Sequence, residues 1–233
     1  MKMSFRYSLP ALALCLATLV CQPETTYGAE GSARLRDELQ SGQSAGTPLD
    51  GRAFEEGDGR WEASKNILQG EAGVSISDRS SFAARVSIPQ KGERYILSAV
   101  VCPVAIDEGA TWIAIGIGDT SVNPVKATWN NGLFLLLSTE GKYELHYNPG
   151  TGDLIRIKGG RASSYWEQGN NTLRMEYNAA GRTVSVRINE APVLSDVELP
   201  PEVDGFEPLF AGFSGYGQKS EANSISHFEL SVQ

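Results

Sequence analysis

Three segments of the sequence place a flat aromatic side chain close to amide or carboxylate groups. They are an apolar run around Trp112, the segment Trp129-Asn130-Asn131-Gly132, and the segment from Tyr165 to Asn170. Tyr147 stands just before a fourth polar turn. Aromatic faces stack on pyranose rings, while amides and carboxylates bond to the hydroxyl groups. The residues with this chemistry are Trp112, Trp129, Asn130, Asn131, Tyr147, Trp166 and Glu167.

Trp112 differs from the other candidates because its strand predicts the direction in which it points. In the run from Thr111 to Ile117 every second residue is isoleucine, which is typical of a half-buried strand. The isoleucines should face the core, so Trp112 should face outward. The alternative for each loop tryptophan is that it closes an open end of the fold. Trp61 is expected in the core.

Glycoside hydrolysis would need two carboxylates roughly 5 Å apart, typically from a strand that reads Glu-x-Asp-x-x-Glu. The chain contains no such run and no Gly-x-Ser-x-Gly elbow for a serine nucleophile. Whether the protein is an enzyme therefore stays open, leaning towards no. If it hydrolyses glycosides, the candidate carboxylates are Glu144, Glu176 and Glu229.

The sequence predicts no bound metal. Glu55, Glu56 and Asp58 fall in a Gly-rich turn, where carboxylate oxygens suit calcium, but they lack a spaced Asp-x-Asp pattern. We expect a solvated loop there. His146 and His227 are expected on outward faces beside Glu144 and Glu229, as ordinary surface histidines.

The elements that must position these residues are strands. From residue 49 onward, short β-branched and aromatic runs recur between Gly, Asn, Asp and Pro clusters, without an amphipathic helix of ten residues. About a dozen strands are too many for a seven-stranded immunoglobulin-like domain and favour a jelly-roll sandwich. The expected strands are 60–64, 66–69, 73–76, 82–88, 95–101, 111–117, 132–138, 142–147, 154–158, 172–177, 183–188, 192–194, 209–216 and 227–232.

Two of these strands, 172–177 and 183–188, are predicted to form a hairpin. The turn between them, Asn178-Ala179-Ala180-Gly181, offers Gly181 for a positive φ angle. The hairpin would leave four side chains on one solvated face: Arg174, Glu176, Ser185 and Arg187.

The N-terminal segment predicts export. Lys2 and Arg6 precede an apolar run from Leu9 to Val20 that is too short to span a bilayer, and the small residues near Ala29 suit signal cleavage. We therefore expect a signal peptide over 1–29, a flexible arm with one possible helical turn over 30–48, and one sandwich domain over 49–233. The alternative is a lipoprotein with Cys21 as its lipidated residue. Lipidation favours a small residue just before the cysteine, and Val20 is not small.

Charge and cysteine content narrow the class of partner. Loss of Lys2, Arg6 and Glu24 would change 20 basic and 28 acidic side chains to 18 and 27, a net charge of −9. Such a surface repels nucleic acid and anionic membranes. Only Cys102 would remain, as an inert buried thiol, and export without a disulfide suggests a bacterial protein that is secreted or periplasmic.

The order of several segments resembles the concanavalin A-like lectin/glucanase superfamily, in particular bacterial secreted laminin G-like jelly rolls. These segments are Leu49-Asp50-Gly51 to Trp61, Ile67-Leu68-Gln69-Gly70, the strands at Tyr95 and Trp112, Asn171 to Tyr177, Val184 to Asn189, Ala211-Gly212-Phe213 and His227 to Leu230. The resemblance covers residues 49–233. The 3-keto-disaccharide hydrolase-like domain is a more distant relative, whose Asn-Ser-Gly-Ile and Phe-Arg-Asn runs are missing here.

The resemblance implies two curved antiparallel sheets with a ligand on the concave face or its rim. Its members include lectins, glycan-binding modules, glucanases and adhesion domains, so the fold leaves the function open. We expect a carbohydrate-binding or adhesion-type module. The alternatives are a glycoside hydrolase and a structural domain that only contacts other proteins.

Overall fold

The computed structural model describes most of the chain from Ser32 onward. The described residues are 32–40, 46–70, 73–76, 80–103, 111–119, 122–123, 128–129, 131–150, 153–167, 169–203, 205–217 and 223–233. The predicted signal peptide lies outside the described residues. All described residues fall in one compact unit, Gly31–Gln233.

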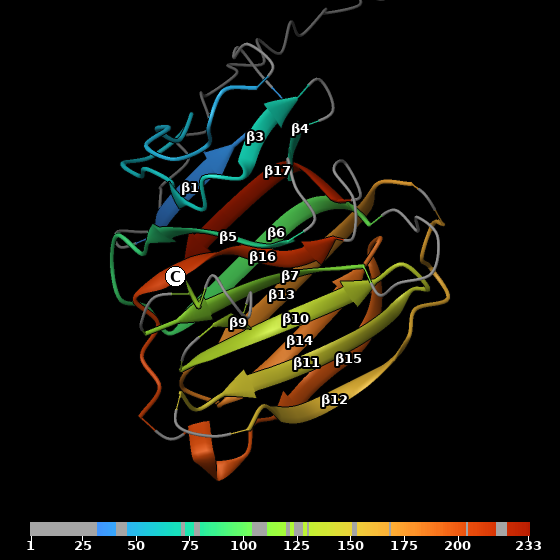
Figure 1. Cartoon of the computed structure of the whole chain (residues 1–233). Helices are drawn as coiled ribbons and strands as arrows, with labels where there is room; N and C mark the ends of the chain where they lie inside the picture. The colour runs from blue at the N-terminus through green and yellow to red at the C-terminus, as the bar shows by residue number, and fades with distance from the viewer. Residues whose placement is uncertain are drawn as a thin grey trace, which may run out of the picture. The chain divides into compact units, whose positions relative to one another are not determined.

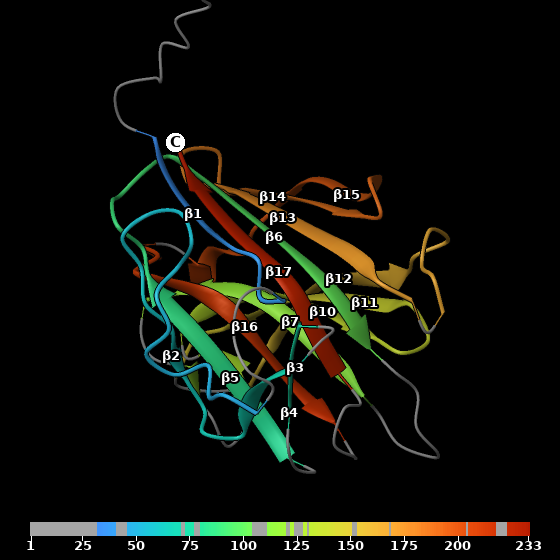
Figure 2. The ribbon, with the colours of Figure 1, turned by 90° about the horizontal axis from the view of Figure 1, so that it is seen from above.

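Two antiparallel sheets lie face to face, which confirms the predicted jelly-roll sandwich (Figures 1 and 2). We call them the front sheet, with strand order β12-β11-β10-β7-β16-β5-β2, and the back sheet, with order β15-β14-β13-β6-β17-β4-β3 and β1 beside β17. A short hairpin of β8 and β9 contacts the front sheet at β5, β7 and β10. No helix among the described residues is long and apolar enough to cross a membrane.

All predicted strands are present, with bounds that differ by up to four residues, whereas β1, β8 and β9 were not predicted. The front sheet contains β2 (Glu62–Ala63), β5 (Ser80–Ser87), β7 (Trp112–Gly118), β10 (Gly132–Ser138), β11 (Lys142–Asn148), β12 (Ile155–Arg161) and β16 (Phe210–Gly217). The back sheet contains β1 (Ala33–Asp37), β3 (Ile67–Gly70), β4 (Gly73–Ile76), β6 (Arg94–Pro103), β13 (Asn171–Asn178), β14 (Thr183–Ile188), β15 (Ala191–Glu198) and β17 (Asn223–Val232). The hairpin is β8 (Val122–Asn123) and β9 (Thr128–Trp129), and η1 (Pro201–Val203) is a short 3-10 turn.

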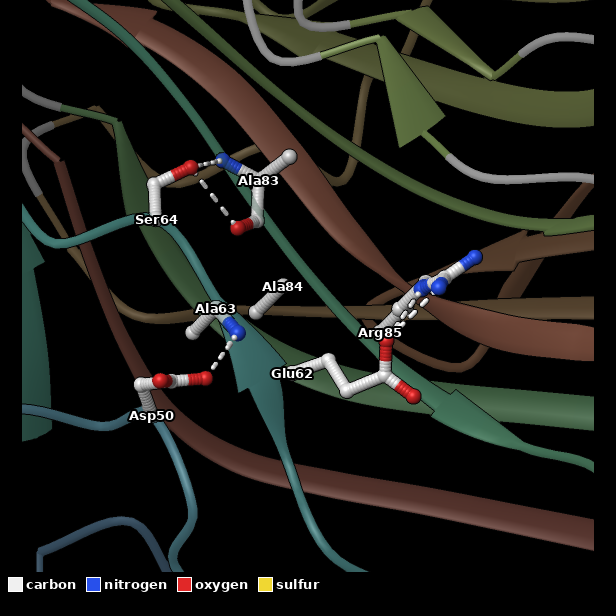
Figure 3. A pocket seen from close by; sticks show the side chains of 7 residues that line it. All are labelled: Asp50, Glu62, Ala63, Ser64, Ala83, Ala84 and Arg85. Carbon is white, nitrogen blue, oxygen red and sulfur yellow. Dashed lines mark hydrogen bonds and ion pairs between the residues drawn. The ribbon is translucent and has the colours of Figure 1, made fainter.

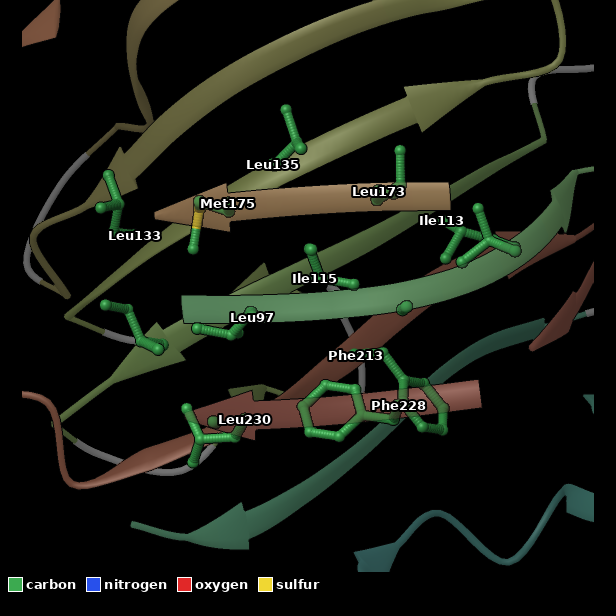
Figure 4. Close-up of a cluster of buried hydrophobic side chains, with 14 of the residues drawn as sticks. Leu97, Ile113, Ile115, Leu133, Leu135, Leu173, Met175, Phe213, Phe228 and Leu230 are labelled. Carbon is green, nitrogen blue, oxygen red and sulfur yellow. The ribbon is translucent and has the colours of Figure 1, made fainter. Parts of the chain in front are cut away.

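The core lies between the sheets and consists of alternate side chains from both. Ile113 and Ile115 of β7 lie across from back-sheet residues such as Leu97 and Met175, and all four are 0% exposed (Figure 4). The period of two in each strand produces this layer, because successive side chains point to opposite faces. The inward prediction for the isoleucines is therefore confirmed.

An aromatic cluster fills the end of the core near the chain's N-terminal strands. Trp61 stacks on Phe54 with ring centroids 4.6 Å apart, and lies 5.2 Å from both Phe213 of the front sheet and Phe228 of the back sheet. The predicted core position of Trp61 is confirmed at 1% exposure. This one indole therefore joins the two layers.

Part of the predicted arm 30–48 is a strand, because β1 covers Ala33–Asp37, where the sequence suggested a possible helical turn. β1 pairs with β17 in a register that runs from Ala33 opposite Val232 to Asp37 opposite Phe228. Leu35 and Leu39 are buried at 1% exposure each. The prediction of a helical turn was wrong because the two leucines are diluted among charged residues such as Arg34 and Arg36, whose side chains face outward.

Asp37 ties β1 to the core through a buried polar contact. Its carboxylate accepts a hydrogen bond of 2.6 Å from Trp61 Nε1 and one of 2.8 Å from Arg52 Nη2. Asp37 is fully buried, and this burial raises the pKa of its carboxyl group despite the opposing effects of Trp61 and Arg52. Arg52 therefore neutralises a charge that the apolar layer would otherwise exclude.

The hairpin of β13 and β14 is confirmed, with one correction to its turn. The register pairs Arg174 with Arg187 and Glu176 with Ser185, so these four side chains share one face of the back sheet as expected. The positive φ angle falls on Arg182, at 50°, and not on Gly181. Gly181 instead donates its backbone N–H to the side chain of Asn178, at 2.9 Å.

The acidic turn considered for calcium is an ion-paired loop. Glu56 contacts Arg36 at 3.3 Å, and Glu55 contacts Arg52 at 3.3 Å. Gly57 has φ +89°, and a Cβ there would lie 2.4 Å from the carbonyl oxygen of Arg34. The turn thus packs directly against β1, and its carboxylates serve as partners of arginines.

Replacing Arg52 by methionine should destabilise the fold by about 3 kcal/mol at pH 7, because it leaves the Asp37 carboxylate buried without its cation. Without Arg52 the pKa of Asp37 rises further, and a raised folded-state pKa means that stability is lost as the pH rises. The deficit should therefore shrink when urea unfolding is repeated near pH 4. Arg187→Met, at an exposed site, should leave the free energy of unfolding almost unchanged. An equal deficit at both pH values would contradict the assigned role of Arg52.

Candidate functional site

Trp112 points away from the core, as the alternation in its strand predicts. It opens β7, where Ile113, Ile115 and Ile117 are 0% exposed on the inner face. Its half-buried ring lies at the border of a small apolar cluster on the outer face that includes Ala83, Ala114 and Phe134. The outer face of the front sheet thus has a hydrophobic floor.

A groove of about 490 Å³ opens beside this indole. It spans the outer face of β7, β10 and β11 and the turn that joins the last two. Its lining combines an aromatic ring, a leucine, two hydroxyl groups and three charged side chains: Trp112, Leu136, Ser138, Thr139, Glu140, Lys142 and Glu144. Hydroxyl and charged groups beside an outward-facing, half-buried indole are suited to a ligand with a flat apolar face and a polar edge.

The charged side chains of the groove are held by ion pairs. Glu140 Oε2 lies 2.7 Å from Lys142 Nζ and 3.4 Å from Arg161 Nη2. Glu144 lies 3.1 Å from Arg156 Nη2 and 2.9 Å from His146 Nε2. The hydrogen bond from Lys142 lowers the pKa of the Glu140 carboxyl group, so Glu140 stays ionised at neutral pH.

Trp166 lies in the loop that rests on the same turn. The hydroxyl group of Tyr165 donates a 2.9 Å hydrogen bond to the carbonyl of Thr139, which lines the groove. Trp166 is 63% exposed, and Glu167 beside it is also exposed. The structure therefore brings the Trp166 loop and the Trp112 groove to one end of the front sheet.

Asn171 holds this loop in shape. Its side chain is fully buried, accepts a hydrogen bond from Trp166 N at 2.9 Å and donates to Trp166 O at 3.0 Å and Gly169 O at 2.8 Å. Asn189 donates to the same Asn171 oxygen, at 2.8 Å. Asn171 is thus the residue that positions Trp166.

Asn131 and Tyr147 lie at the opposite end of the front sheet. Tyr147 is 3% exposed and packs edge-on against Phe206, so its ring offers no stacking face. Its hydroxyl group donates a 2.6 Å hydrogen bond to Asn131 Oδ1, and Asn131 Nδ2 donates to Asp119. Asn131 has a φ angle of 42°, a conformation that asparagine tolerates. Tyr147 therefore supports Asn131 from within the core.

The predicted site residues thus separate into two groups. Trp112 begins β7 and Gly118 ends it, so the groove and the Asn131 end are separated by roughly 20 Å along the strand. Trp129 belongs to β9, but its side chain lies outside what the structure describes, and so does all of Asn130. Sequence reasoning brought these residues together because it had no information on strand register.

A second pocket, of about 370 Å³, lies near β2 and β5 (Figure 3). Arg85 donates to Glu62 Oε2 at 2.6 Å, and Asp50 accepts a 2.9 Å hydrogen bond from the backbone of Ala63. Ser64 exchanges hydrogen bonds of 3.0 Å with the backbone of Ala83. The polar groups drawn there bond to each other, and the pocket lacks an aromatic platform.

The three carboxylates considered for hydrolysis lie on different sheets. Glu144 is on the outer face of the front sheet, whereas Glu176 and Glu229 are on the back sheet and pair with Arg94 and Arg34. Glu140, the other acid of the groove, is kept ionised by Lys142 and so is poorly suited to donate a proton. Glu144 is therefore separated by the core from Glu176 and Glu229, and each of those two is paired with an arginine.

Neither histidine belongs to a metal cluster in the part of the chain that the structure describes, where no group of three or more His, Cys, Asp or Glu side chains is suitably placed. His146 stacks on Phe134 and contacts Glu144, while His227 contacts Glu38 at 3.0 Å on the other sheet. Both lie beside the carboxylates that the sequence predicted, but their side chains are only 12% and 18% exposed, so the expectation of solvated surface histidines was wrong. Burial raises the pKa of the Cys102 thiol, which keeps it protonated.

Sequence reasoning missed most of the polar lining of the groove. The alternation that turned Trp112 outward also turns Ser138 and Lys142 outward on their strands. Ser138 lies opposite Trp112 in the register of β7 and β10. Asn171 was considered only as the start of a segment that carries the family resemblance. The sequence did contain a signal for Asn171. It lies two residues before Leu173, so the alternation of the strand turns this polar side chain inward.

No family model matches this chain, and no curated protein matches it in sequence. Its structure is similar to the carbohydrate recognition domain of Emp47p, with a TM-score of 0.59 and 10% identity over 87% of this chain and 97% of that one. The potassium-bound carbohydrate recognition domain of Emp46p has a TM-score of 0.57, with 13% identity over 73% and 87%. The exoplasmic/lumenal domain of VIP36, in a form bound to Ca²⁺ and Man2, has a TM-score of 0.52, with 16% identity over 84% and 86%.

Sequence identities this low show the fold alone. The similarity covers 87% of this chain for Emp47p and 84% for VIP36. The chain therefore has the concanavalin A-like jelly-roll fold that its segments resemble.

Proposed function

We propose that this chain is an exported carbohydrate-binding module that holds a glycan in the Trp112 groove. The observation that carries the proposal is the outward indole of Trp112 beside a lining of hydroxyl and charged side chains. A pyranose ring has an apolar face that stacks on an indole and equatorial hydroxyl groups that need hydrogen-bond partners. Ser138, Thr139 and the two carboxylates can supply those partners.

The comparisons support this class of ligand. Two of the similar structures are carbohydrate recognition domains, and the VIP36 domain was seen with Man2. The predicted signal peptide over 1–29 supports export, and the net charge of −8 disfavours nucleic acid as a partner. We carry the carbohydrate class over to this chain, and leave the identity of the sugar to experiment.

Trp112→Ala should lower the affinity for a bound glycan roughly tenfold or more, because it removes the stacking platform. Retention of the secreted protein on a glycan array, followed by calorimetry on the best ligand, measures this effect. Trp112 is half-buried on the outer face, so the variant should still unfold cooperatively. Unchanged retention of a folded variant would remove Trp112 from the site.

Trp166→Ala should affect only longer glycans. Its loop rests on the turn that lines the groove, so a chain of several sugars can reach it, whereas a single sugar on Trp112 cannot. Calorimetry should show a loss of several-fold for oligosaccharides and no change for the monosaccharide. Ser163→Ala, at an exposed position shortly before Trp166, is the matched control for a general change in the loop. An equal loss for the monosaccharide would contradict this assignment.

Asn131→Ala tests the other end of the sheet. It removes hydrogen bonds to Tyr147 and Asp119, and should lower the free energy of unfolding by about 1–2 kcal/mol. Glycan affinity of the folded variant should be unchanged, because the groove lies at the opposite end of β7. Loss of retention without loss of stability would move the proposed site to the Asn131 end.

A further inference from the structure

The lining of the Trp112 groove has one cation and two carboxylates, and two arginines paired with those carboxylates reverse this balance. Lys142 lines the groove, and Arg156 and Arg161 pair with its two carboxylates, Glu144 and Glu140. Three cations therefore face two anions, with His146 beside them. The chain as a whole has the opposite balance, a net charge of −8. The groove is thus a local reversal of the overall charge.

Lys142 and Arg161 lie directly opposite each other on β11 and β12. Like charges in such a cross-strand pair repel and destabilise a sheet. Both are neutralised by the same oxygen, Glu140 Oε2, at 2.7 and 3.4 Å. One carboxylate thus neutralises two cations, and one positive charge is left over at the rim of the groove.

All three side chains of this trio are exposed, Glu140 by 58%, Lys142 by 63% and Arg161 by 66%. Exposed ion pairs of this kind contribute little to stability. A ligand anion can therefore take the place of Glu140 beside Lys142 and Arg161, or join it, at low cost.

The platform and the cations lie in one row across the sheet. Trp112 lies opposite Ser138 of β10, the Ser138 hydroxyl group donates to the Lys142 carbonyl at 3.4 Å, and Lys142 lies opposite Arg161. Adjacent strands are about 4.8 Å apart, so Trp112 and Lys142 begin about 10 Å apart with a small serine between them. This spacing accommodates a sugar ring on the indole whose substituent extends towards the lysine.

Gly159, which lies opposite Glu144 on β12, leaves space for the side chain of Arg156. A Cβ at this position would lie 2.7 Å from Arg156 Nη2, so the guanidinium group folds over the glycine to reach Glu144. Arg156 is thereby held above the sheet at the same rim as Lys142 and Arg161. Lys142, Arg156 and Arg161 thus lie along β11 and β12, on the same face of the sheet as Trp112.

We propose that the groove selects a negatively charged sugar, whose carboxylate or sulfate group binds between Lys142 and Arg161 while its ring stacks on Trp112. This proposal rests on the proposed carbohydrate-binding function. Arg161 contributes a planar fork that matches either anion, and Lys142 contributes a point charge. The acidic remainder of the surface disfavours nonspecific attachment of a polyanion.

Two pairs of polymers with matched backbones test the proposal on the full secreted chain. They are polygalacturonate with its fully methyl-esterified form, and dextran sulfate with dextran. We expect the charged member of at least one pair to bind about tenfold or more tightly than its neutral partner, and the pair that responds identifies carboxylate or sulfate. The preference should weaken as sodium chloride is raised, since salt screens exposed charges.

Lys142→Gln should remove most of this preference, while Lys91→Gln, which deletes an exposed positive charge elsewhere, should leave it intact. Thermal unfolding checks that both variants fold. Equal binding of charged and neutral polymers, lost in Trp112→Ala, would overturn the charge selection but keep the carbohydrate-binding function. A preference that survives Lys142→Gln, or binding to none of the four polymers, would overturn the proposal, and in the latter case the glycan array decides the function separately.

Discussion

Between the two sheets, side chains from alternate positions of each strand meet in one continuous apolar layer. Ile113 and Ile115 of β7, Met175 of β13 and Leu230 of β17 are all 0% exposed there. Full burial of one such side chain stabilises a fold by roughly 1.5–3 kcal/mol, and this layer repeats that contribution across both sheets. Among the described residues the only cysteine is Cys102, so the layers are held by this burial and by the ladders at each strand. Asp37 is a charged exception, and Arg52 pairs with it at 2.8 Å.

The same constraint determines what the outer faces can display. A strand that gives every second residue to the core must present the others outward, and on β7, β10 and β11 those residues are Trp112, Ser138, Lys142 and Glu144. Their spacing is therefore determined by the register of the ladder. On the back sheet the same alternation yields charged residues such as Arg34 and Glu229, which pair with each other in solvent. The backbone geometry of the two outer faces is similar. The outward-facing indole of Trp112 with hydroxyl groups beside it therefore reflects the residue types of the front sheet.

The sequence predicted the strands and the direction of their side chains well, but not the distances between candidates. Alternation is a local property, so Trp112 could be turned outward and Trp61 assigned to the core from a few neighbours each. Pairing between strands is nonlocal, and it decided that Asn131 lies at the far end of β7 from Trp112 and that Tyr147 is buried beneath Asn131. β1 was missed because two leucines among charged residues look like a polar arm until β17 provides an edge for them. Local alternation therefore predicts which face of a strand a side chain is on, whereas the distance between two side chains depends on how the strands pair.

A groove built on strands has a consequence for recognition. Trp112, Ser138 and Lys142 each stand on a backbone that is bonded to strands on both sides, so little freedom is lost when a ligand binds. Binding to such a rigid surface avoids the ordering cost that flexible loops incur. The Trp166 loop shows the complementary solution, because the buried amide of Asn171 fixes a segment that has no ladder of its own. Strand register and one amide network thus place both tryptophans at the same end of the sheet, where a chain of sugars could contact them in sequence.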